Sequence, residues 1–114
     1  MHEANVDLFR VAREGDRWHI KLIVGPELTP DIPGDYDLHL AQKFSELLSA
    51  RKPEVQVDLG AHPAISSRQL GVLIALQRAL RPKIGLLPLS NVGPAVLRLL
   101  DVTRTGQFFT VLPS

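Results

Sequence analysis

The sequence predicts an α/β domain in which a mixed β-sheet of about five strands is flanked by helices. Short runs of alternating apolar and polar residues are separated by segments of about 10–15 residues with helical periodicity. This spacing is typical of strand–helix–strand crossovers, which place the two strands parallel in one sheet. The 114 residues and the apolar content of 45% fit a single domain, residues 1–114, with one core.

The N-terminal part of the chain predicts two strands within residues 7–24, joined by a turn around Gly15. In the second of these strands, alternation places one set of apolar side chains on the same face: Trp18, Ile20, Leu22 and Val24. Gly25 and Pro26 end the strand. Residues 26–34 contain three prolines and a glycine, and they predict a loop.

Three helices and three further strands follow, which gives the order ββαβαβαβ. The predicted helices cover residues 36–50, 67–81 and 91–103, and the predicted strands cover residues 55–59, 84–89 and 108–112. We expect Pro82 to end the second helix, because proline stops helical hydrogen bonding. We expect Asn91 to cap the third helix, with Pro94 in its first turn. Asp58 follows a strand and is interpreted as a turn or capping residue.

Charge is divided unevenly along the chain. Up to Asp58 there are eleven acidic and seven basic residues, whereas Asp101 is the only acidic residue after it, against six basic ones. Such an asymmetry can attract an acidic partner or favour self-association, although two faces of one small domain can also differ by chance. The overall charge of +1 argues against a nucleic-acid partner bound by neutralising phosphates.

Several classes of chemistry have no residues to support them. The absence of cysteine excludes disulfides, thiolate metal sites and cysteine nucleophiles. The phosphate-binding and nucleophile-elbow motifs are missing, and the four histidines lack the spacing of a helical zinc site. We therefore expect no enzyme activity, cofactor or metal. The polar N-terminus and the lack of an apolar run of about 18 residues predict a cytoplasmic domain without membrane insertion.

The most informative segment is residues 63–80, where two serines precede the second predicted helix. A serine at a helix start accepts a hydrogen bond from a free backbone N–H. The same position suits a phosphoryl group, because free N–H donors and the positive end of the helix dipole meet there. Ser66 or Ser67 can therefore be a plain capping residue or a phosphoacceptor, with Arg68 next to it.

From Val55 to Val111 the chain resembles the STAS domain, the fold of bacterial anti-sigma-factor antagonists. Residues 55–76, VQVDLGAHPAISSRQLGVLIAL, are similar to the family pattern VxLDLSGVxFIDSSGLGVLLAL. Residues 91–103, NVGPAVLRLLDVT, with Phe108 and Phe109 beyond them, are similar to NVSPAVRRLLELTGLDRLF. Residues 20–29 also resemble the second strand and the following turn of the family, with Pro26 inserted. The resemblance implies a STAS-like fold.

The same resemblance assigns roles to residues of the serine segment. Ser67 takes the position of the family's phosphoacceptor, and Ser66 is the alternative acceptor. Around it the family's Asp, second Ser and Gly are replaced by Ser66, Arg68 and Gln69. Arg and Gln side chains beside the acceptor would crowd an approaching kinase. The resemblance therefore supports the fold and a binding role more strongly than phosphorylation.

Two functions follow from the resemblance. The first is a regulatory protein-binding module that switches partners with an anti-sigma factor or serine kinase, with phosphorylation of Ser67 as the switch. Arg68, Gln69 and Val72 would then be exposed contacts; packing in the core is an equal alternative for Val72. The second function is an unphosphorylated STAS subunit of an ABC-type lipid transporter or of a signalling scaffold.

Overall fold

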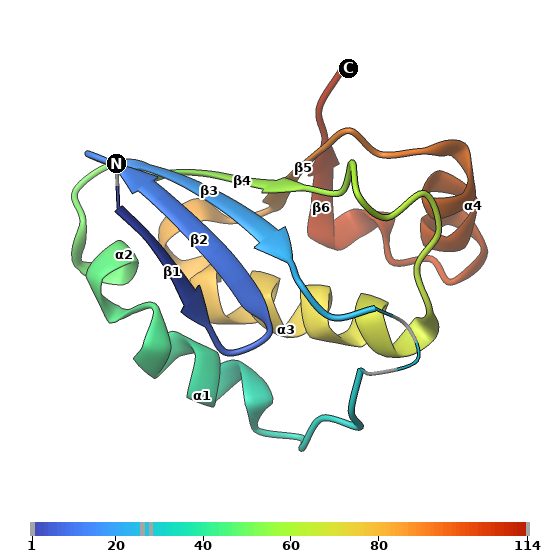
Figure 1. The fold of residues 1–114 in the computed structure, drawn as a ribbon, viewed down its shortest axis with the longest axis horizontal. Coiled ribbons are helices and arrows are strands. Elements are labelled where there is room, and N and C mark those ends of the chain that lie inside the picture. The colour runs from blue at the N-terminus through green and yellow to red at the C-terminus, as the bar shows by residue number, and fades with distance from the viewer. Residues whose placement is uncertain (1, 26, 28, 114) are drawn as a thin grey trace.

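The computed structural model describes residues 2–25, 27 and 29–113, which form a six-stranded sheet with helices packed against it (Figure 1). The strands are β1 (His2–Val6), β2 (Phe9–Glu14), β3 (Arg17–Leu22), β4 (Glu54–Asp58), β5 (Leu87–Ser90) and β6 (Phe109–Val111). The helices are α1 (Tyr36–Lys43), α2 (Ser45–Ser49), α3 (Ser67–Ile84) and α4 (Pro94–Val102), with a short 3₁₀ helix at Gly106–Phe108. Of the predicted loop over residues 26–34, Pro26 and Leu28 lie outside the described residues.

The sheet is mixed, and its strands lie side by side in chain order from β1 to β6. The pairings of β1 with β2 and of β2 with β3 are antiparallel, whereas the pairings from β3 to β6 are parallel. A mixed sheet flanked by helices is therefore confirmed. The expected number of about five strands was too low by one, because β1 is an edge strand whose residues are mostly exposed and show no apolar alternation.

The core lies on one face of the sheet. In β3 the apolar side chains Trp18, Ile20 and Leu22 are buried, and the alternating residues between them are exposed on the opposite face. Each parallel connection moves one place in the same direction along the sheet. Right-handed crossovers of this kind bring their helices to the same face. Figure 1 shows α2 and α4 at opposite ends of the sheet, with α3 running between them.

The predicted helix over residues 36–50 is divided into α1 and α2. Phe44 lies between them with φ −101° and ψ 28°, outside the helical range. Its side chain is buried and meets Phe9 of β2 edge to face, with ring centroids 6.3 Å apart. The change of direction at Phe44 lets both Phe44 and Leu47 reach the core.

Two predicted boundaries in the C-terminal half were wrong. Pro82 does not end α3, which continues to Ile84 and closes at Gly85 with φ 68°. A proline this close to the helix end removes only one interior hydrogen-bond donor, and Pro82 is exposed. The following strand consequently starts at Leu87 instead of residue 84.

Asn91 is likewise not the cap of the last helix. It adopts a left-handed conformation with φ 55°, and Gly93 takes the capping position before Pro94. Asparagine tolerates this backbone region better than most residues. The predicted helix is therefore shorter at its start, and the Asn91 side chain is available for another contact.

Candidate functional site

The serine segment forms the start of α3, an 18-residue helix. Ser66 is the capping residue: its hydroxyl accepts a hydrogen bond from the Gln69 backbone N–H at 3.1 Å. In return, the Gln69 side-chain oxygen Oε1 accepts from the Ser66 backbone N–H at 2.8 Å. This reciprocal pair is a capping box, which satisfies two donors that the helix start would leave free. Ser67 is the first residue of the helix and is exposed.

Arg68 is also exposed and faces the segment that follows β3. Its Nε lies 3.0 Å from Oδ1 of Asp31, and 56% of its side chain is accessible. An ion pair this exposed contributes about 0–1 kcal/mol to stability. Arg68 can therefore leave Asp31 at little cost.

Gln69 and Val72 are buried, both with 0% exposure. The prediction of an exposed contact was wrong for Gln69, whereas for Val72 the alternative of packing in the core is the one that the structure shows. The apolar face of α3 is wider than the stripe seen in the sequence, because this helix packs against both the sheet and α1. Val72 consequently belongs to the core. For Gln69, the capping pattern Ser-x-x-Gln was the signal in the sequence that could have identified an inward-facing role.

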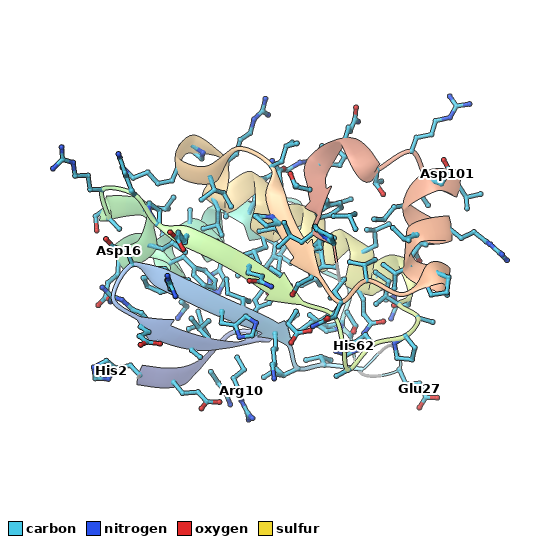
Figure 2. The ribbon with its side chains drawn as sticks, turned by 90° about the horizontal axis from the view of Figure 1, so that it is seen from above. His2, Arg10, Asp16, Glu27, His62 and Asp101 are labelled. Carbon is cyan, nitrogen blue, oxygen red and sulfur yellow. The ribbon has the colours of Figure 1, made fainter. Side chains whose placement is uncertain are left out.

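Long-range hydrogen bonds tie the start of α3 and the loop before it to the end of β3. The Gln69 amide Nε2 donates to the carbonyl of Val24 at 3.0 Å. His62, which lies in the loop beyond the carboxyl end of β4 (Figure 2), donates from Nε2 to the carbonyl of Leu22 at 2.7 Å. The sequence could not reveal the role of His62, because its partner is 40 residues away. These bonds hold the backbone on both sides of Ser67 in place.

Asp58 at the end of β4 joins the loop before α3 to the loop before α4. We call this region, together with the start of α3, the corner. Its Oδ1 accepts from the Gly60 backbone N–H at 2.8 Å and from the Asn91 amide at 3.0 Å. The interpretation of Asp58 as a turn residue is confirmed by the first of these bonds. The bonds from Asn91 and Gly60 favour the charged carboxylate and lower the pKa of Asp58 below its usual value. The loops before α3 and α4 are thereby fixed to each other.

Ser67 presents an exposed side chain at this corner. Among residues 2–25, 27 and 29–113, no three His, Asp or Glu side chains gather in a way that could hold a metal ion. No helix in the described part of the chain is long and apolar enough to cross a membrane. What the corner offers is Ser67, Arg68 and the free N–H groups of the first helical turn.

A scan against protein-family models finds no matching family, and a search of curated proteins finds no match. The resemblance to the STAS domain therefore rests on the sequence segments alone.

Proposed function

We propose that the protein is a regulatory protein-binding module of the STAS type that acts as an anti-sigma-factor antagonist. Its partner is an anti-sigma factor with serine-kinase activity, and phosphorylation of Ser67 switches the complex. The observation that carries the proposal is the position of Ser67, exposed at the first residue of a long helix whose approach loop is fixed. A cytoplasmic location fits such a module.

The switch is electrostatic. A phosphate on Ser67 adds about −1.5 to −2 charges at neutral pH. The helix start tolerates this charge, because its N–H groups and dipole stabilise anions. The partner, which had docked on an uncharged serine, then meets a charged group and binds less tightly. Ser66 is the less suitable acceptor because its hydroxyl already belongs to the capping box.

The contact surface differs from the one expected from the sequence. Gln69 and Val72 are buried and cannot touch a partner directly. Ser67 and Arg68 remain as contacts. Gln69 contributes indirectly, by holding the loop through Val24 and the cap through Ser66.

The test is incubation of the protein with ATP and the serine kinase encoded beside its gene. We expect a mass gain of one phosphoryl group that is lost in Ser67→Ala and kept in Ser66→Ala. Binding of the kinase is measured in parallel, and we expect Ser67→Glu to weaken it while Ser67→Ala preserves it. No mass gain, together with equal binding by both Ser67 variants, would contradict the proposal.

A second candidate is an unphosphorylated STAS subunit of an ABC-type lipid transporter or of a signalling scaffold. It is favoured by the Arg68–Asp31 pair beside Ser67, since the family pattern has small and acidic residues where this chain has Arg68, Gln69 and Ser66. Co-purification with an ATPase subunit, lost in Arg68→Ala and unaffected by Ser67→Glu, would support this candidate over the first.

A further inference from the structure

A cleft of about 500 Å³ opens on the helix-covered side of the sheet, far along the chain from Ser67. It lies between β1, β2 and the bend where α1 passes into α2. Ala4, Val11 and Phe44 give it apolar walls, Trp18 lies among its lining residues, and Arg13 and Lys43 supply positive charge. We call it the Trp18 cleft.

The cleft exists because the helix layer does not extend over the edge strand. Ala4 of β1 pairs with Val11 of β2, so both side chains point to the same face. Val11 is buried beneath the helices, whereas Ala4 on the same face is exposed. α1 ends at Lys43 and α2 begins at Ser45, so the helical path bends beside this edge. The space that remains is apolar below, and Arg13, Lys43 and Glu46 lie among its lining residues.

Trp18 has an unsatisfied donor. Only 7% of the residue is exposed, and its indole Nε1 has no hydrogen-bond partner within the described part of the chain. A buried N–H without an acceptor is unfavourable, and such groups are rare in folded proteins. The atom itself is covered, so only a rearrangement of the neighbouring side chains would bring an acceptor to it.

Arg13 lies over the same indole. Its guanidinium carbon is 4.6 Å from the ring centroid, and it forms an ion pair with Glu46 of α2. Glu46 is 73% exposed, so its carboxylate is held in place by little besides Arg13. The Glu46 carboxylate thus contacts a guanidinium that lies over the Trp18 ring. The carboxylate of a bound organic acid would contact Arg13 in the same way.

We propose that the Trp18 cleft binds a small carboxylic acid with a flat apolar body. The ligand carboxylate replaces Glu46 on Arg13, with Lys43 nearby as a second positive charge. The apolar body lies against Val11, Phe44 and the edge strand. Because the Trp18 indole is among the residues that line the cleft, its environment changes when the ligand binds. This site is independent of the proposed role of Ser67.

The chain has one tryptophan, so one indole resonance in a ¹H–¹⁵N spectrum reports on the site. The probe is 3-phenylpropionate, and its control is the neutral amide 3-phenylpropionamide. We expect the acid to cause a saturable shift of the Trp18 indole and of the Ala4 amide. The neutral amide should bind about tenfold more weakly, because it lacks the charge-assisted bond to Arg13.

Two variants should change the affinity in opposite directions. Arg13→Gln should weaken binding of the acid about tenfold, and Glu46→Gln should strengthen it because Arg13 loses its internal competitor. Arg10→Gln is the matched control, since Arg10 belongs to the same strand but alternates onto the opposite face. A spectrum that is unchanged elsewhere shows that each variant is folded.

The proposal is overturned if the acid produces no saturable shift. It is also overturned if the acid and the amide bind equally, or if Arg13→Gln and Glu46→Gln leave the affinity unchanged.

Discussion

The two ends of the molecule are held together by different kinds of contact. At the corner where α3 begins, a half-buried and a buried side chain bond to backbone groups, as His62 does to Leu22 and Gln69 to Val24. At the other end, around β1 and the β2–β3 turn, exposed ion pairs predominate, such as Arg10 with Glu3 and Arg17 with Glu54. Buried hydrogen bonds cost much when broken, whereas exposed ion pairs cost little. Deforming the corner therefore costs more free energy than breaking the contacts of the edge.

The strongest test of this difference between the two regions is to remove the buried side-chain amide of Gln69 at the corner. Gln69→Leu keeps the size of the side chain and leaves the Val24 carbonyl and the Ser66 N–H without partners. We expect the free energy of unfolding to fall by about 1–3 kcal/mol, measured by urea denaturation. Arg68→Ala, one position away and exposed, should cost less than about 1 kcal/mol. Equal losses in the two variants would remove the distinction between the regions.

The β1–β2 turn, which lies beside the carboxyl end of β3, also uses a half-buried bond. Asp7, with φ 54°, accepts a hydrogen bond from the Tyr36 hydroxyl, and His39 Nε2 lies 3.1 Å from its other oxygen. Tyr36→Phe should lower the free energy of unfolding by about 1 kcal/mol. Burial, followed by the bond to Asp7, raises the pKa of Tyr36.

The raised pKa gives this contact a pH dependence. Above about pH 10 the unfolded chain loses the tyrosine proton while the folded protein keeps it, so stability falls as the pH rises. Thermal unfolding between pH 8 and pH 11 should show a steeper loss for the wild-type protein than for Tyr36→Phe. Parallel curves would mean that the turn is held by other contacts.

Asp58 tests the electrostatics of the corner. Because its pKa is lowered in the folded protein, the unfolded chain binds a proton first as the pH falls. The stabilisation is thus present above the ordinary value of 3.8 and is lost as the pH drops through the folded value. Asp58→Asn should cost about 1 kcal/mol at pH 7, and this cost should shrink as the pH falls below the ordinary value of 3.8. If the loss in the free energy of unfolding does not change with pH, the charge of Asp58 does not contribute and only the geometry of its hydrogen bonds matters.

The smallest effect is expected at the exposed edge. Glu54→Gln breaks the pair with Arg17, whose Nε lies 3.5 Å from Glu54 Oε2, and both side chains are about three-quarters exposed. We expect a change in the free energy of unfolding below about 0.5 kcal/mol, which urea denaturation would resolve only as a small shift. A loss comparable to that of Gln69→Leu would show that the edge is as rigid as the corner.

Elements with clear periodicity could be predicted from the sequence, and elements without it could not. β3 alternates because one face is buried, and the apolar spacing of α3 marks a helix against a core. β1 has no buried face, so its residues carry no pattern. The predictions that Pro82 ends α3 and that Asn91 caps α4 were wrong. The effects of these residues depend on their place in the helix and on backbone angles, which a sequence pattern does not contain.

The same limits apply to the candidate site. The position of Ser67 at a helix start followed from local chemistry, since two serines preceded an apolar helical run. The burial of Gln69 and Val72 depends on which elements surround α3, and so does the role of His62. Trp18 was expected on an apolar face, but the gap above it depends on where the helix layer ends.

The order of the sheet has a consequence for how the chain folds as it is made. Every strand lies beside the one that precedes it in the sequence, so none is inserted between two earlier strands. Synthesis from the N-terminus therefore makes each of these strands after the strand that precedes it in the sheet, and pairing requires no insertion between two earlier strands. The antiparallel strands β1, β2 and β3 pair over short sequence separations, whereas each parallel pair joins strands that a helical segment separates, so we expect the antiparallel part to be the faster to close.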